Sequence, residues 1–104
     1  MWIQVIKTRL KAGKESELQG VMDALLETEQ PGSGLIRSTM ARDQKDPSVV
    51  YTIVVFESEE KARAREQDER RHAGLAKVRA LMEEIFEGPR EFVDLDVVAE
   101  HTGR

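Results

Sequence analysis

The longest run of apolar residues in the chain, residues 47–57, predicts a β-strand that is buried on both faces. Its residues are β-branched or aromatic almost throughout, which favours a pleated strand over a helix. Pro47 begins it, where a residue without a backbone N–H is well tolerated. Side chains alternate between the faces of a strand, and here both faces are apolar: Val49, Tyr51, Ile53 and Val55 on one, Val50, Thr52, Val54 and Phe56 on the other. Such a strand needs cover on both sides.

Three further segments have the pattern of strands: residues 2–10, 35–43 and 90–99. On the first of them, one face carries Trp2, Gln4, Ile6 and Thr8. Residues 43–47 contain the Asp, Lys and Pro typical of a turn, and we expect them to join the segment 35–43 to the long apolar strand as a hairpin.

Residues 15–29 carry the period of an amphipathic helix. The apolar positions fall at i, i+3, i+4, i+7 and i+8 and are Leu18, Val21, Met22, Leu25 and Leu26. Pro31 and the glycines that follow it predict the end of this helix.

A second helical region begins at Ser58, a good N-cap residue that is followed by two glutamates. Alanine is its only apolar residue type up to Arg71. This composition favours a solvated helix with i, i+4 ion pairs over the alternative, a charged docking surface. Residues 72–74, His-Ala-Gly, predict a break or bend. An apolar stripe then returns over residues 75–86, and Gly-Pro at 88–89 predicts the helix end.

The predicted order, β-α-β-β-α-β, indicates an α+β fold of the ferredoxin-like type. In this fold one four-stranded antiparallel sheet carries both helices on one face. The chain has 104 residues, which is enough for one small core, so we predict a single domain over residues 1–104.

Composition narrows the classes of function. The net charge is -4 and no basic patch is present, which argues against a nucleic-acid partner. No segment approaches the roughly 20 apolar residues of a membrane span, and the N-terminus lacks the pattern of a signal peptide. We therefore expect no membrane partner and a cytoplasmic location, with which the absence of cysteine agrees. His72 and His101 lie 29 positions apart, a spacing that matches no zinc motif, so we predict no metal.

The second face of the sheet predicts a homodimer. Two helices cover one face, and nothing in the chain remains for the other, although both are apolar. Leaving about eight large side chains exposed would forfeit on the order of 10 kcal/mol. A second copy packed sheet to sheet about a two-fold axis supplies the cover. The alternative is a monomer whose open face is partly polar, with Arg37, Thr39, Asp94 and Asp96 as the polar groups.

Several stretches resemble one known family. They are the opening strand with its turn at residues 11–15, the sequence Pro-Gly-Ser-Gly-Leu at 31–35, the Asp-Pro turn at 46–47, and the strand end Val-Val-Phe-Glu-Ser-Glu-Glu-Lys-Ala at 54–62. His72 follows the charged helix, where many members of the family carry a histidine. On these features the chain resembles the antibiotic biosynthesis monooxygenase-like family of dimeric α/β barrels.

The resemblance implies a pocket between the sheet and the helices for a small hydrophobic or aromatic ligand. It also implies monooxygenation of an aromatic or quinol-type compound without flavin, metal or another cofactor, because the substrate itself activates oxygen. Substrate-binding residues in such a pocket would be Trp2, Gln4, Ile6 and Phe56, with Val54 on the same face, and His72 would be catalytic. A haem-degrading branch of the family uses an asparagine that aligns with Ile6 and a tryptophan that aligns with Phe56.

These features predict one of two functions. One is a cofactor-independent oxidoreductase of the monooxygenase type, and the other is a non-catalytic small-molecule binding or accessory dimer of the same fold. Haem degradation ranks third, because the chain has no asparagine and Phe56 has no N–H to offer. His72 is either a base or ligand at neutral pH or a surface histidine at a helix bend. Asp94 and Asp96 are either paired carboxylates or partners of Arg37 or Arg42 across a dimer interface.

Overall fold

The computed structural model describes all 104 residues and has a four-stranded antiparallel sheet as its centre. The strands are β1 (Trp2–Leu10), β2 (Leu35–Arg42), β3 (Val49–Phe56) and β4 (Phe86–Asp96), in the spatial order β2-β3-β1-β4. Both neighbours of β1 run antiparallel to it, and a hairpin joins β2 to β3. This is the predicted ferredoxin-like α+β fold.

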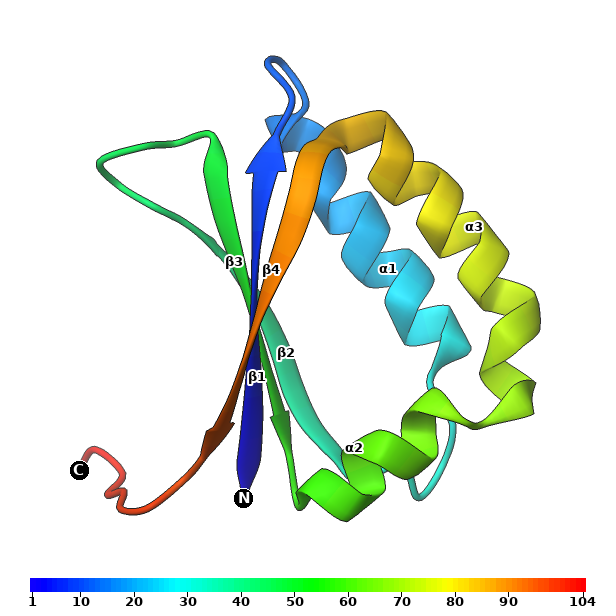
Figure 1. Ribbon diagram of the computed structural model, residues 1–104, viewed down its shortest axis with the longest axis vertical. Helices are drawn as coiled ribbons and strands as arrows, with labels where there is room; N and C mark the ends of the chain where they lie inside the picture. The colour runs from blue at the N-terminus through cyan, green and yellow to red at the C-terminus, as the bar shows by residue number, and fades with distance from the viewer.

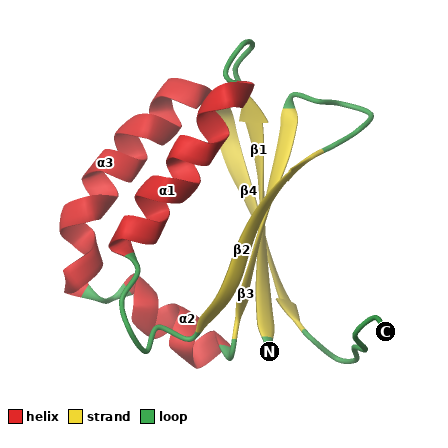
Figure 2. Cartoon of the chain, turned by 180° about the vertical axis from the view of Figure 1, so that it is seen from behind, coloured by secondary structure: helices red, strands yellow, loops and turns green.

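The helices are η1 (Glu15–Glu17), α1 (Leu18–Thr28), α2 (Glu59–Glu66) and α3 (Glu69–Ile85). Figures 1 and 2 show α1 and α3 side by side on one face of the sheet, with α2 across the end where β3 finishes, and no helix on the other face. Ser58 caps the N-terminus of α2, as predicted: its hydroxyl accepts a hydrogen bond from the backbone N–H of Lys61 at 3.1 Å. No helix is both long and apolar enough to cross a membrane.

Strand register decides which face meets the helices. Residues that pair across antiparallel strands share a face, and the pair Trp2–Phe56 and the pair Leu10–Phe86 lie on the helix side. The helix side holds two core clusters at opposite ends of the sheet. One cluster contains Trp2, Val54, Phe56 and Ala62, and the other contains Leu10, Val21, Val50 and Ile85.

The opposite face is apolar and has no cover within the chain. By register its large apolar side chains are Ile3, Val5, Val49, Tyr51, Ile53, Val55, Val93 and Leu95. Val93 is 51% exposed and Leu95 is 43% exposed, whereas Val49 and Val55 are already buried by their neighbours in the sheet.

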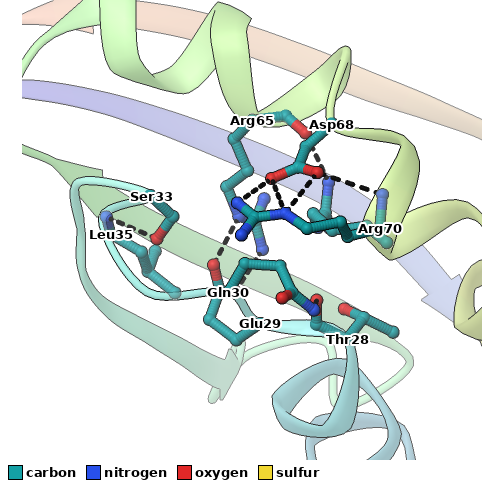
Figure 3. A network of polar contacts seen from close by, with 9 residues as sticks. Thr28, Glu29, Gln30, Ser33, Leu35, Arg65, Asp68 and Arg70 are labelled. Carbon is teal, nitrogen blue, oxygen red and sulfur yellow. Dashed lines mark hydrogen bonds and ion pairs between the residues drawn. The ribbon is translucent and has the colours of Figure 1, made fainter.

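The predicted helix break at residues 72–74 was wrong. The break lies at Gln67 and Asp68, where the Asp68 carboxylate accepts a hydrogen bond from the backbone N–H of Arg70 and caps α3. The Arg70 guanidinium holds the pKa of Asp68 at about 2 (Figure 3). Gly74 lies inside α3, and a Cβ atom at this position would come within 2.8 Å of Cγ2 of Thr28. This glycine allows a close approach of α3 to α1 rather than a bend.

The predicted C-terminal boundaries also need correction. Helix α3 ends at Ile85, and Phe86 begins β4, so the strand covers 86–96 and not 90–99. Gly88 and Pro89 do not end the helix but lie within β4. There the register against β1 shifts, because Lys7 pairs with Glu91 and Arg9 with Glu87. Gly88 has a φ of +73°, which suits glycine, and a bulge on an edge strand tolerates a proline.

Candidate functional site

A cavity of about 530 Å³ lies between α1 and the sheet, and residues of α2 line one end of it. This size is within the usual range for a small-molecule site. Its floor on the central strands is formed by Trp2, Gln4, Ile6, Val54 and Phe56. Helix α1 contributes Met22, Leu25 and Leu26, and α2 contributes Ala62, Arg65 and Glu66.

The floor of the cavity is aromatic at one end. The rings of Trp2 and Phe56 lie 5.9 Å apart at a tilt of 47°, and both residues are almost fully buried. The alternation of β1 and β3 brings Trp2, Gln4, Ile6 and Phe56 to this floor, which is where the sequence places its candidate binding residues. Their role in binding a substrate stays a prediction.

The exposed rim of the cavity carries both apolar and polar side chains: Leu26 and Ile36, and also Gln19, Asp23, Arg37 and Glu66. Leu26 of α1 is 74% exposed and Ile36 of β2 is 44% exposed, and both line the cavity. The opening therefore lies between α1 and the edge strand β2.

An ion pair lies at the α2 end of the cavity. The Arg65 guanidinium donates from Nε and Nη2 to the two carboxylate oxygens of Glu29, at 2.9 and 2.8 Å (Figure 3). Burial raises the pKa of Glu29, but the hydrogen bonds and positive charge of Arg65 outweigh this effect, so the pKa of Glu29 is lowered. Arg65 also lies 5.4 Å from the centre of the Phe56 ring. Glu29 is thus a fixed anion here rather than a proton acceptor.

Arg65 and Glu29 were not predicted as residues of the site from the sequence. The stretch 59–66 reads as a solvated helix, and its i, i+4 ion pairs, Lys61 with Glu57 and Arg63 with Glu59, are present. Ala62, however, is only 2% exposed and marks the face of α2 that turns inward. Arg65, three positions later, follows it onto that side. The sequence alone carried no such signal, because Ala64 of the same helix is exposed and nothing in the pattern distinguishes the two alanines.

His72 lies on the exposed surface of α3 and is not among the residues that line the cavity. The cavity lining contains no histidine at all. The catalytic role of His72 stays a prediction, and in this chain it has no contact with the cavity to support it. His101 lies in the C-terminal tail, outside any helix or strand.

Within the chain, Asp94 pairs with Gln4 and Arg63. Its two carboxylate oxygens accept hydrogen bonds from Nε2 of Gln4 and Nη2 of Arg63, each at 3.0 Å. By register Asp94 and Asp96 lie on the helix side of β4, opposite Gln4 and Trp2. Neither is therefore on the open face that a sheet-to-sheet dimer would use.

The residues present do not fit haem. Haem iron in proteins is usually held by His, Cys or Tyr, or by Met together with His. Of these residue types only Met22 lines the cavity. The cavity therefore lacks the usual side chains to ligate a haem iron.

A ferredoxin-like sheet with one apolar cavity between sheet and helix defines an α+β protein built around a site of small-molecule size. A family model described as Antibiotic biosynthesis monooxygenase matches residues 1–83. The chain belongs to the antibiotic biosynthesis monooxygenase family, as its resemblance predicts.

Solved structures of the same fold agree with this assignment. A mutant of MhuD, crystallised with two manganese protoporphyrin IX molecules per active site, has a TM-score of 0.78 at 18% identity, covering 99% of this chain and 100% of that one. An antibiotic biosynthesis monooxygenase has a TM-score of 0.68 at 16% identity, with 95% and 100% covered. Rv0793 from Mycobacterium tuberculosis has a TM-score of 0.67 at 13% identity, with 98% and 100% covered. At such identities the likeness shows the fold alone. No curated protein matches the sequence.

Proposed function

We propose that the protein binds a small aromatic or quinol-type compound in the cavity and oxygenates it without a bound cofactor. The observation that carries this proposal is the cavity itself, whose floor is apolar and holds the paired rings of Trp2 and Phe56. Membership of the monooxygenase family supports the type of reaction. We expect the reaction to take place in the cytoplasm.

The reaction that we propose consumes one O₂ per substrate. An electron-rich substrate supplies the electrons. One oxygen atom enters the substrate, and the other leaves as water with two hydrogens that the substrate loses. The chain then has to bind the substrate, orient it and exclude water, which an apolar cavity does. Trp2, Ile6 and Phe56 would hold the ring, and Gln4 would supply the polar contact on the floor.

A homodimer belongs to the same proposal. We propose that two chains pack through the open face of the sheet, because this face carries large exposed apolar groups such as Val93 and Leu95. The cavity lies on the opposite side of the sheet, so this packing would leave its mouth free.

A second function is favoured by one specific observation. The cavity has no histidine to act as a base near neutral pH. A non-catalytic binding or accessory dimer would need the same cavity and no such base. Both functions predict binding of an aromatic compound, and only the first predicts oxygen consumption.

The experiment follows binding and turnover separately. Trp2 is the sole tryptophan and lines the cavity, so its indole N–H signal in a ¹⁵N NMR spectrum reports occupancy. We expect hydroquinones and phenols to shift this signal, and a matched reaction under ¹⁸O₂ to give product carrying one labelled oxygen. The variant Val54→Phe fills the floor and should abolish both effects, whereas Val98→Phe, in the exposed tail, should change neither. Binding without uptake of oxygen would favour the accessory role. No shift of the Trp2 signal with any aromatic probe would contradict both functions.

A further inference from the structure

The amide of Gln4 is held in one orientation by Asp94. Nε2 of Gln4 donates to Oδ1 of Asp94 at 3.0 Å, across the β1–β4 ladder where these two residues pair directly. An ionised carboxylate only accepts hydrogen bonds. The nitrogen and oxygen of a side-chain amide are often hard to tell apart, but here the carboxylate decides between them: the NH₂ group of Gln4 must face Asp94.

Asp94 is itself fixed as an anion. Hydrogen bonds from Gln4, and then from Arg63, lower its pKa, although partial burial acts in the other direction. Arg63 donates to Oδ2 of Asp94 at 3.0 Å, and its guanidinium lies 5.0 Å from the centre of the Trp2 ring. Arg63 thus links the carboxylate to the aromatic floor of the cavity from outside.

The carbonyl oxygen of Gln4 is left free. Gln4 lines the cavity but Asp94 does not, so the NH₂ group is turned away from the lining. Oε1 of Gln4 accepts no hydrogen bond within the protein and is not a buried, unpartnered atom. Among the lining residues of the two central strands, Gln4 is the only polar one. Two further polar side chains of the sheet line the cavity, both from β2: Ser38, which can donate and accept, and Arg37, which only donates and is exposed to solvent.

We propose that Asp94 is a positioning residue that makes the cavity present a hydrogen-bond acceptor, Oε1 of Gln4, and so selects aromatic ligands that carry an O–H or N–H donor. This inference rests on the proposed function and names its substrate class more narrowly. A hydroquinone or phenol fits the site, whereas the corresponding quinone or ether has no donor to offer.

The test compares two ligands of similar shape, 1-naphthol and 1-methoxynaphthalene, by calorimetry on the full chain. The wild type should bind 1-naphthol about five- to tenfold more tightly, the effect of one hydrogen bond. In Asp94→Asn the side chain at 94 can donate as well as accept, so the Gln4 amide is free to turn. We expect the preference to fall below about twofold while the affinity for 1-methoxynaphthalene is unchanged.

Asp96→Asn is the matched control. Asp96 lies two residues further along β4 on the same face and is exposed, but it has no hydrogen bond to Gln4. It should keep the wild-type preference. Equal affinities for the two ligands in the wild type, or an unchanged preference in Asp94→Asn, would overturn the inference and leave the proposed function standing.

A second readout needs no ligand. The two side-chain N–H signals of Gln4 should be widely separated in the wild type and in Asp96→Asn, because one proton is bound to a carboxylate, and should move together in Asp94→Asn. Signals that do not respond to Asp94→Asn would overturn the positioning role directly. If these signals respond but no aromatic ligand binds, the proposed function fails, and the selectivity that we infer fails with it.

Discussion

Arg65 and Glu29, 36 positions apart in the chain, form a bidentate ion pair, and their side chains are only 14% and 18% exposed. The pair ties α2 to the residue that ends α1, at one end of the cavity. We infer that this pair helps to hold that end of the cavity in place, together with the packing of Ala62 against the sheet and the hydrogen bond from Arg63 to Asp94.

The first prediction concerns the pH dependence of this pair. The pKa of Glu29 is lowered from about 4.5 by folding, so its contribution to stability is present above that value and is lost as the pH falls through the lower, folded pKa. Glu29→Gln should lower the free energy of unfolding by about 1 kcal/mol at neutral pH. In urea titrations the difference from wild type should shrink as the pH is lowered below about 4.5 and through the lower, folded pKa.

Glu27→Gln is the control for this experiment. Glu27 pairs with Lys77 at 3.4 Å, but both side chains are about two-thirds exposed, so its loss should change stability by less than about 0.5 kcal/mol. Equal effects of the two substitutions would contradict a special role for Glu29.

The second prediction concerns the open face of the sheet. Val93 and Phe92 are adjacent on β4, are 51% and 53% exposed, and point to opposite faces. If the open face is the dimer interface, Val93→Lys should convert a species of about twice 11.8 kDa into a monomer in sedimentation equilibrium. Phe92→Lys should remain dimeric. A wild-type protein that is monomeric at micromolar concentration would remove the basis for sheet-to-sheet packing.

The third prediction concerns the contact between α1 and α3. Alanine at position 74 would place its Cβ 2.8 Å from Cγ2 of Thr28, so Gly74→Ala should destabilise the protein by about 1 kcal/mol despite its better helix propensity. In a Thr28→Ser background, which keeps the hydroxyl and removes the methyl group, the same substitution should stabilise by several tenths of a kcal/mol. Gly20→Ala in α1 meets no atom within 4 Å and should stabilise in either background. Equal effects of Gly74→Ala with Thr28 and with Ser at position 28 would show that the two helices yield without cost.

The fourth prediction concerns a buried arginine without an ion-pair partner. Arg71 is 6% exposed, donates from Nη1 to the carbonyl oxygen of Arg65 at 3.2 Å, and leaves Nε without a partner. Burial lowers its pKa, since the charged form is poorly solvated there. Arg71→Met keeps most of the packing and removes the charge, so thermal unfolding should show an unchanged or higher Tm.

The exposed Arg79 on the same helix provides the comparison, and Arg79→Met should leave Tm nearly unchanged. A clear loss of stability in Arg71→Met alone would contradict this prediction. It would mean that Glu29, although it is already paired with Arg65, also needs the positive charge of Arg71 nearby.

Local pattern was enough for most of the fold. The strand 49–56 follows from its β-branched run, and α1 from its apolar stripe, because the pleat and the helical turn are properties of adjacent residues. The same periodicity places Trp2, Gln4, Ile6 and Phe56 on one face, and the structure puts all four on the cavity floor.

Local pattern failed where a distant residue decides the outcome. Gly74 suggested a helix break, but its role is to make room for Thr28 of α1. Gly88 and Pro89 suggested a helix end, but they lie where the register of β4 against β1 shifts. Asp68, which caps α3, was hidden among the other charged residues of its segment.

The sequence by itself determined which side chains of a strand share a face of the sheet, because the alternation along a strand is set by backbone geometry. It did not determine which of the two apolar faces receives the helices, since both satisfy the same pattern. Only the tertiary structure decided that, and with it the pairing of Glu29 with Arg65 and of Gln4 with Asp94, 90 positions apart. Such contacts depend on strand order and helix placement, which are settled by the packing of the whole chain rather than by any one segment of it.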